Sequence, residues 1–184
     1  MIDIYKWAIE NNLIKASALP SLKVMKDFFC NLKINIAVEI GTFYGVSATC
    51  IARFANKVHT FDIIDHPEKD KVWSKFKVED KISFHLIKGR NVVDNTFKDF
   101  EGIHTLTGKE GDIETILNTI NFDFAFINGS HTYKDVKADF ELVKKCGRVL
   151  FHDIDPEFVG VHRFTNEIGI KVICHNIGYW EGLK

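Results

Sequence analysis

The sequence has little of what marks a secreted, membrane-bound or metal-stapled protein. Its four cysteines are scattered without a C-x-x-C pair, which predicts reduced thiols and gives no zinc pattern. No apolar run reaches membrane-spanning length, and no signal peptide is evident at the start. Only three prolines occur, and no low-complexity linker or repeat divides the chain. We therefore expect a single cytoplasmic domain over residues 1–184.

An excess of charge of one sign is also missing. The formal net charge is −1, so the chain has no global attraction to nucleic acid or to anionic membranes. Its 46% hydrophobic and 27% charged residues are ordinary for a globular protein with a sizeable core. We expect neither nucleic acid nor membrane as a partner, and the sequence leaves open whether the chain forms a homodimer.

The most informative stretch that is present is Glu39–Ser47, with the sequence EIGTFYGVS. It follows an apolar run and precedes a helix-compatible segment, and a strand, glycine turn and helix in this order present backbone N–H groups to a ligand. In the dinucleotide fingerprint G-x-G-x-x-G, the first glycine would stand at the position of Glu39. The last glycine would come three residues after Gly41, whereas here the next glycine, Gly45, comes four residues after it. A carboxylate repels a pyrophosphate and favours an ammonium group. The turn therefore predicts a nucleoside ligand with an amine and no phosphates, such as S-adenosylmethionine (SAM).

Apolar and amphipathic segments alternate along the chain. This alternation predicts an α/β fold with a mostly parallel, right-handed sheet covered by helices on both faces. We predict strands over residues 35–40, 57–61, 122–127, 148–153, 171–175 and 178–181. We predict helices over residues 3–16, 44–55, 68–76, 133–146 and 160–167, with two more beginning near residues 19 and 111. Residues 1–33 would form a helical cap that covers the sheet or roofs a pocket.

The third strand is ambiguous. Residues 82–87 and residues 102–107 are both strand-like, and each is closely followed by a glycine. We prefer the second segment because Gly111 and Asp112 can start a helix that leads directly to the next strand. Residues 77–101 would then be an insertion with room for a strand of its own.

Polar residues at the carboxyl ends of the predicted strands are the candidate ligand-binding residues, because ligands bind there in open α/β sheets. Asp62 follows Gly41 by 21 residues, the spacing of an acid that binds a ribose diol, although it could simply cap the next helix. Glu39 ends a buried strand and needs a cation, either the amine of SAM or an internal lysine or arginine. Ser47 could receive the methionine carboxylate of SAM or serve only as a helix-start serine.

The later strands end in residues that can handle protons or metals. His131 could accept a proton near neutral pH, or it could be a helix N-terminal histidine satisfied by the backbone. His152 and Asp153, together with Asn128, are candidate metal ligands. The amide of Asn128 is neutral and a poor partner for Mg²⁺.

In these motifs the chain resembles the class I SAM-dependent methyltransferases. It is most similar to small-molecule O-methyltransferases of the catechol type and to short bacterial methyltransferases with an I-D-G-x-H motif. The resemblance covers residue 34 to the C-terminus. It rests on the stretches Glu39–Ser47, Asp62, Phe122–Tyr133, Gly147–Asp153, Gly160–Phe164 and Gly178–Trp180.

The resemblance implies a Rossmann-like three-layer sandwich with a seven-stranded sheet whose last strand is antiparallel. It assigns cofactor-binding roles to Glu39, Gly41, Thr42, Gly45, Ser47, Asp62, Glu110, Gly111, Asp112 and Asn128. Within this set, Glu39, Gly41 and Ser47 would hold the methionine end of SAM, Asp62 the ribose, and residues 110–112 would flank the adenine. The catalytic residues it implies are His131, which aligns with the base, and Asp153.

The chain departs from the family at its metal and acceptor positions. Catalytic Mg²⁺ in the catechol type is held by an aspartate after the fourth strand and an Asp-Asn pair after the fifth. Here these positions are Asn128 and Asp153-Ile154. The short bacterial family has aspartates at the positions of Asn128 and Ser130.

We therefore expect methyl transfer from SAM to an oxygen or nitrogen of a small-molecule acceptor, and Mg²⁺ dependence stays open. One alternative is a protein that binds SAM or S-adenosylhomocysteine (SAH) without catalysis, as Asn128 and Ser130 would favour. The other is a nicotinamide-dependent oxidoreductase, against which Glu39 argues.

Overall fold

A seven-stranded sheet runs through the centre of the molecule. The computed structural model describes residues 3–15, 19–87 and 112–182. The strands are β1 (Ile34–Ile40), β2 (Ala55–Asp62), β3 (Ile82–Leu86), β4 (Phe124–Ile127), β5 (Arg148–His152), β6 (Lys171–Cys174) and β7 (Ile177–Glu181). Their order across the sheet is β3-β2-β1-β4-β5-β7-β6. Every neighbouring pair is parallel except the two that involve β7, so the predicted antiparallel last strand is confirmed.

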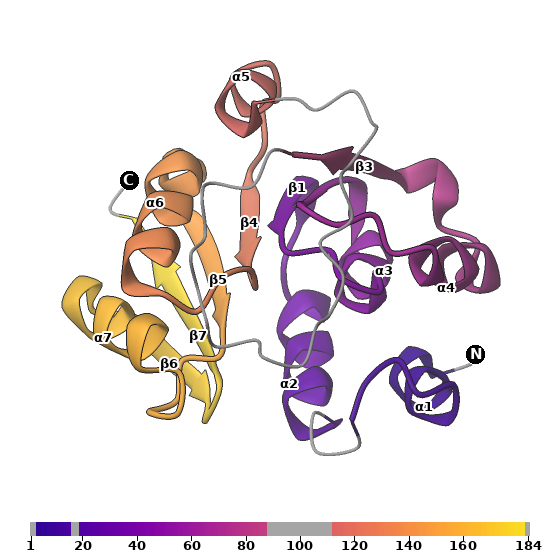
Figure 1. Cartoon of the computed structure of the whole chain (residues 1–184), viewed down its shortest axis with the longest axis horizontal. Helices are drawn as coiled ribbons and strands as arrows, with labels where there is room; N and C mark the ends of the chain where they lie inside the picture. The colour runs from indigo at the N-terminus through magenta and orange to yellow at the C-terminus, as the bar shows by residue number, and fades with distance from the viewer. Residues whose placement is uncertain (1–2, 16–18, 88–111, 183–184) are drawn as a thin grey trace.

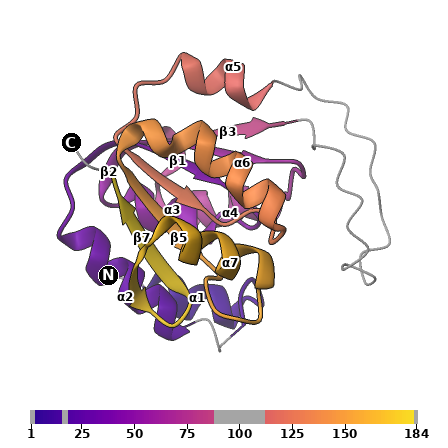
Figure 2. The same ribbon diagram turned by 90° about the vertical axis from the view of Figure 1, so that its left-hand side faces the viewer.

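Helices cover both faces of this sheet (Figures 1 and 2). They are α1 (Ile4–Glu10), α2 (Leu19–Cys30), α3 (Val46–Ala52), α4 (Glu68–Phe76), α5 (Ile113–Asn118), α6 (Tyr133–Val143) and α7 (Val159–Ile168). One hydrophobic core joins α1–α4 to one face of the sheet, and a second core joins α5–α7 to the other. The predicted Rossmann-like three-layer α/β sandwich is therefore confirmed.

The strand next to β2 differs from our prediction. Residues Ile82–Leu86 form β3 and pair with β2 from Val58 to Asp62, whereas residues 102–107, which we preferred, lie outside the described residues. The preference was wrong because β3 is an edge strand whose residues after Ile82 are only half-buried, so polar Ser83 and His85 are tolerated and weaken the strand signal. β3 also falls inside the segment 77–101 that we expected to be an insertion.

The N-terminal helices pack on the α3 side of the sheet. Helix α1 buries Ile4, Tyr5 and Ala8, and the Tyr5 hydroxyl donates a hydrogen bond to Cys50 Sγ in α3 at 2.6 Å. The helix ends at Glu10 rather than at residue 16 as predicted, because Asn12 adopts a left-handed conformation with φ 59°. The description of residues 1–33 as a cap on a single domain stays a prediction.

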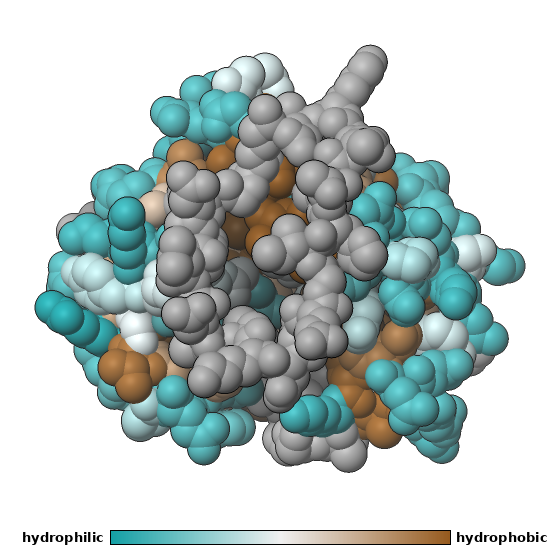
Figure 3. Space-filling model, viewed as in Figure 1, coloured by the Kyte–Doolittle hydropathy of each residue, from teal (hydrophilic) through white to brown (hydrophobic). Residues whose placement is uncertain are grey.

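Surface polarity agrees with a folded domain of this size. Figure 3 shows hydrophilic residues around most of the periphery of one face, with hydrophobic residues visible in the upper middle and again at the lower right. Within the described residues, none of the helices has the length and apolar character needed to cross a bilayer.

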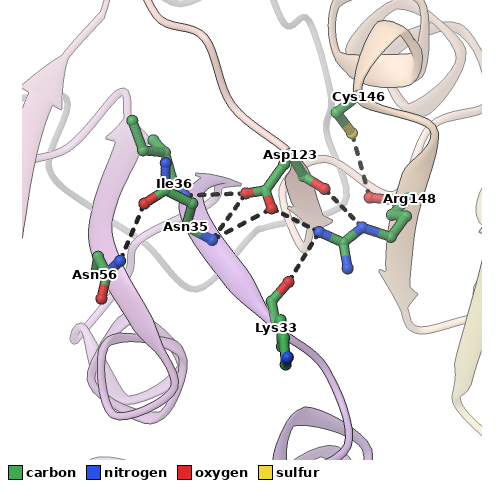
Figure 4. Close-up of polar contacts among 7 residues, drawn as sticks. All are labelled: Lys33, Asn35, Ile36, Asn56, Asp123, Cys146 and Arg148. Carbon is green, nitrogen blue, oxygen red and sulfur yellow. Dashed lines mark hydrogen bonds and ion pairs between the residues drawn. The ribbon is translucent and has the colours of Figure 1, made fainter.

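An ionic network ties the strands together at the edge opposite the site described below (Figure 4). Asp123 accepts hydrogen bonds from the backbone N–H groups of Asn35 and Ile36 at 2.9–3.2 Å. Arg148 at the start of β5 binds Asp123 Oδ2 through Nη2 at 2.7 Å and also donates to the carbonyl of Lys33 at 3.1 Å. One carboxylate thus joins the amino ends of β1, β4 and β5.

Replacing Asp123 with alanine should destabilise the fold without touching the site. Without the carboxylate, two backbone N–H groups and the Arg148 guanidinium lose their hydrogen-bond acceptor. Hydrogen bonds to a half-exposed charged group stabilise the fold by about 2 kcal/mol in total. For a domain of this size we expect the melting temperature to fall by roughly 4–8 °C in a thermal melt followed by circular dichroism. Asp123→Asn keeps an acceptor and should lose less; equal melting temperatures for wild type and Asp123→Ala would contradict this role.

Candidate functional site

The turn after β1 brings two parts of the backbone into contact. Gly41 has φ 99°, and its N–H donates to the carbonyl of Phe61 at 2.8 Å. A Cβ atom at position 41 would lie 2.1 Å from the backbone oxygen of Asn128 after β4. Only glycine permits this close approach, so the first glycine of the motif brings the carboxyl ends of β1 and β4 together.

The second glycine of the motif has a different neighbour. Gly45 has φ 73° and precedes helix α3 as its N-cap. Its carbonyl accepts a hydrogen bond from Trp73 Nε1 at 3.2 Å, and a Cβ atom would lie 2.5 Å from that nitrogen. The turn is therefore locked between β4 on one side and α4 on the other.

Glu39 lies at the floor of this turn and is fully buried. Its Oε2 atom accepts a hydrogen bond from the Thr60 hydroxyl at 2.5 Å, across the β1–β2 pair in which the two residues face each other. Thr42 Oγ1 lies 2.6 Å from Thr60 Oγ1, and since the Thr60 hydrogen points to Glu39, Thr42 donates in this pair. Among the described residues, Oε1 of Glu39 has no hydrogen-bond partner.

Burial raises the pKa of Glu39 from 4.5 to about 7. The nearby Ser47 side chain and the Thr60 hydrogen bond favour the charged form and lower the pKa, whereas the charge of Asp62 raises it further. Ser47 is close to the carboxylate but makes no hydrogen bond of good geometry to Oε1. No lysine or arginine pairs with Glu39 among the described residues, so the internal-pair alternative has no support there. The site contains a buried carboxylate with one unpaired oxygen, which a cationic ligand would stabilise.

Asp62, at the end of β2, hydrogen-bonds to the backbone of the turn. Its carboxylate accepts three backbone hydrogen bonds, from Phe43 at 2.7 Å, from Ile63 at 2.7 Å and from Ile64 at 3.1 Å. The bond to Phe43 supports a left-handed residue with φ 46° whose ring is 45% exposed. A carboxylate has about four acceptor positions. The proposed ribose contact therefore stays a prediction alongside this structural role.

The other half of the site follows β4 and β5. His131 Nε2 lies 3.0 Å from Asp153 Oδ2, and His152 Nδ1 lies 2.8 Å from Asp153 Oδ1. The second contact is off-line for a hydrogen bond, since His152 Nδ1 has no hydrogen-bond partner of good geometry. One carboxylate, 13% exposed, therefore lies between two imidazoles.

This arrangement makes Asp153 a stable anion. Burial alone would raise its pKa, but the hydrogen bonds and charges of His131 and His152 outweigh burial and lower the pKa to about 2. The residue has φ 58°, a left-handed conformation that aspartate adopts more readily than most residues other than glycine.

Asn128 and Ser130 have local roles in the structure. The backbone N–H of Asn128 donates to the Ile40 carbonyl at 2.9 Å and continues the β1–β4 ladder. The Ser130 hydroxyl donates to Asp135 Oδ2 at 2.8 Å, and Asp135 also hydrogen-bonds the side chain of Thr132, the N-cap residue of α6, through its N–H and its carboxylate. Ser130 is thus part of the helix cap.

The candidate metal ligands are a poor chemical match for Mg²⁺. Within them, no cluster of three or more His, Cys, Asp or Glu side chains is placed to hold a metal ion. Of the three candidate ligands, only Asp153 carries a negative charge, and both of its oxygens face imidazole nitrogens. Asn128 and His152 do not supply the hard, charged oxygen set that Mg²⁺ prefers.

The two halves lie on the same edge of the sheet, because β1, β2, β4 and β5 are parallel and their carboxyl ends point the same way. The first half holds Glu39, Gly41, Thr42, Gly45, Ser47 and Asp62, and the second holds Asn128, His131, His152 and Asp153. Asp112 caps helix α5, accepting from Thr115 N at 3.2 Å, and its predicted contact with the adenine stays a prediction. Glu110 and Gly111 lie outside the described residues.

Sequence reasoning missed three residues of this region. Thr60 hydrogen-bonds Glu39, and nothing in the mixed polar and apolar sequence of β2 sets it apart. The ring of Phe158 contacts the ring of His131 at 4.5 Å between centroids, and Asn176 Nδ2 lies 3.4 Å from His152 Nε2. Both come from segments distant in sequence, which no local pattern could connect to the site.

The sheet order and a glycine turn with an acidic floor define a Rossmann-like fold with a nucleoside-type site at its carboxyl edge. A sequence profile of the family described as "Methyltransferase domain" matches residues 38–154. The chain belongs to this family of methyltransferase domains.

Solved structures with the same fold span several activities. An O-methyltransferase from Bacillus cereus in complex with SAH has a TM-score of 0.63 and 16% identity, covering 97% of this chain and 89% of that one. The O-methyltransferase TomG from Streptomyces achromogenes, involved in tomaymycin synthesis and solved with SAM, gives 0.61 and 17%, covering 99% and 92%. An rRNA methylase from Streptococcus thermophilus gives 0.59 and 14%, covering 89% and 96%. A comparison with curated proteins finds no significant match.

Proposed function

We propose that this chain transfers a methyl group from SAM to an oxygen, or alternatively a nitrogen, of a small-molecule acceptor. The observation that carries the proposal is the fully buried Glu39 carboxylate with an unpaired oxygen at the floor of the glycine turn. The ammonium of the SAM methionine supplies the missing cation, and a dinucleotide pyrophosphate would be repelled. Membership of the methyltransferase family supports the same ligand.

The reaction is an in-line displacement at the sulfonium methyl group. Most of the acceleration would come from holding acceptor and methyl group in line between the two halves of the site. His131, half-exposed and anchored to Asp153, would take the proton from the acceptor. This chain's residues therefore bind the cofactor, orient the acceptor and remove one proton.

Calorimetry combined with methyl transfer tests this proposal. We expect SAM and SAH to bind and NADH not to bind, and methyl-labelled SAM to label at least one member of a panel of phenols, sugars and amines. Binding of SAH without transfer to any panel member would favour the second candidate, a cofactor-binding protein without catalysis. The neutral Asn128 is the observation that favours this candidate. Binding of NADH in place of SAH would contradict both.

Cofactor binding should release protons near neutral pH. In the unliganded protein the pKa of Glu39 is raised to about 7, so part of the population carries a proton. A bound ammonium favours the carboxylate and lowers this pKa, so affinity should rise with pH through the pKa of the unliganded protein. Between about pH 6 and about pH 7 we expect SAH to bind about fivefold more tightly, below the range where an α-amine loses its own proton.

Calorimetry in two buffers of different ionisation enthalpy measures this release directly. Glu39→Gln keeps the shape of the side chain but cannot titrate, so it should bind SAH more weakly and without pH dependence over this range. Identical binding enthalpies in both buffers for the wild type would refute the assignment of Glu39 to the amine.

Chelation should leave the reaction intact. The candidate ligands Asn128, His152 and Asp153 do not make a Mg²⁺ site, and the proton can go to His131. Excess EDTA should therefore change the initial rate by less than about twofold, with rates measured before and after adding Mg²⁺. Loss of activity that Mg²⁺ restores would contradict this reading of the donor set.

A further inference from the structure

The hydrogens of the cluster around Asp153 can be assigned from its geometry. An ionised carboxylate has lone pairs only, so each imidazole nitrogen that faces it must carry the hydrogen. His131 Nε2 makes a hydrogen bond to it at 3.0 Å, and His152 Nδ1 lies 2.8 Å from it in an ion-pair contact that is off-line for a hydrogen bond. The low pKa of Asp153, about 2, keeps the carboxylate ionised at every pH at which the protein would work.

The far side of His152 agrees with this assignment. With its hydrogen on Nδ1, neutral His152 has a lone pair on Nε2, and the Asn176 amide nitrogen, a donor, lies 3.4 Å from that atom. The contact is long, but its donor is Asn176, so the hydrogens of both Asn176 and His152 would point toward Asp153. Asn176 is itself buried at 9% exposure, just before β7.

From this chain of contacts we infer that Nδ1 of His131 is the proton acceptor of the proposed reaction, and that His152 and Asn176 are positioning residues that hold Asp153 for it. The inference rests on the proposed function for its chemistry, but not for its geometry. The Asn176 amide faces Nε2 of His152, the Nδ1 side of His152 contacts Asp153, and the hydrogen bond to Asp153 places the hydrogen of His131 on Nε2. The lone pair of His131 is then on Nδ1, which makes no hydrogen bond to a described residue.

The ring of His131 is also fixed from the other side. Phe158 packs on it at 4.5 Å between centroids. Gly160 in the first turn of α7 lies so close that a Cβ there would be 2.2 Å from the His131 carbonyl oxygen. Residues at the start of α7 therefore contact both the ring and the backbone of His131.

All atoms and charges of the proposed methyl transfer are accounted for. The acceptor oxygen forms a bond to the methyl carbon as the carbon–sulfur bond breaks, and that electron pair stays on sulfur, which becomes a neutral thioether. The acceptor's hydroxyl proton moves to His131 Nδ1. The resulting imidazolium keeps its Nε2 hydrogen toward the Asp153 anion, which stabilises the positive charge.

Imidazole NMR tests the assignment without any methyl acceptor. In protein labelled with ¹⁵N-histidine, long-range ¹H–¹⁵N spectra should show neutral His131 as the Nε2–H tautomer. His152→Phe keeps a ring but removes the donor, so the Nδ1–H tautomer of His131 should become populated. His152→Gln restores an N–H donor and should restore part of the wild-type pattern. His175→Phe, an exposed histidine next to Asn176, is the matched control and should change nothing.

Kinetics separate positioning from a structural role. With an acceptor in hand, His152→Phe should lower kcat about 10-fold while the Kd of SAH stays within about twofold, and His152→Gln should recover most of that loss. A wild-type His131 in the Nδ1–H form would overturn the proton assignment. Unchanged tautomer and kcat in His152→Phe would overturn the positioning role. Absence of SAM binding would defeat the proposed function alone, since the tautomer still decides the geometry.

Discussion

Replacing His131 with alanine should abolish most of the methyl transfer and leave cofactor binding nearly intact. The residue lies in the half of the site after β4 and β5, so its removal takes away the proposed proton acceptor and its contacts with Asp153 and Phe158, but no contact with Glu39 or Asp62. General-base catalysis contributes about 10²- to 10⁴-fold, and we expect kcat to fall by that amount while the Kd of SAH changes less than about twofold. Single-turnover rates and calorimetry on the same preparation measure both quantities.

The exposed His175 again provides the control. His175→Ala should keep both kcat and cofactor affinity. If His131→Ala lost cofactor affinity in proportion to turnover, His131 would be a binding or folding residue, and the assigned role in proton transfer would be wrong.

Substituting Gly41 with alanine should have the largest effect on the cofactor half of the site. The new Cβ would lie 2.1 Å from the Asn128 oxygen and 2.6 Å from its carbonyl carbon, both backbone atoms that cannot rotate away. The ends of β1 and β4 must separate, and φ 99° is strained for alanine as well. We expect the free energy of unfolding to fall by about 3 kcal/mol or more, and SAH affinity to fall at least about 10-fold in the variant that still folds.

Gly147→Ala separates the clash from the backbone strain. Gly147 also has positive φ, 74°, but a Cβ there meets no atom within 4 Å. It should lose only the cost of a left-handed alanine, about 1–2 kcal/mol, and keep its SAH affinity. Equal losses in chemical denaturation for the two variants would show that the contact between the strand ends is unimportant.

The parts of the fold that sequence predicted are those dictated by local composition. β1 and β4 are apolar runs buried on both faces, and helix α4 begins and ends at the predicted residues because its caps are local. β3 was assigned to the wrong segment because an edge strand owes its identity to pairing with β2, a contact that composition does not record. The same holds for Thr60 and Asn176, whose partners Glu39 and His152 are brought to them by the sheet.

The candidate site divides in the same way. Glu39 and Gly41 lie in one continuous motif, and Asp62 follows it at a known spacing, so the sequence could identify all three. Ser130 looked like a departure at the acceptor end, and only the structure shows it bonded to Asp135 in the cap of α6. The cofactor and catalytic roles of these residues stay predictions until ligand binding is measured.

The close seating of helix α7 has a consequence for how such a domain can be altered. The family profile ends at residue 154, yet Phe158 rests on His131, Gly160 touches the backbone of the same loop, and Asn176 reaches His152. The segment beyond the profile therefore contacts both histidines of the half of the site after β4 and β5. If residues 38–154 were exchanged between relatives as an autonomous module, His131 of one protein would be packed against the residues after position 154 of another. Hybrids should therefore be joined ahead of β4 or beyond β7.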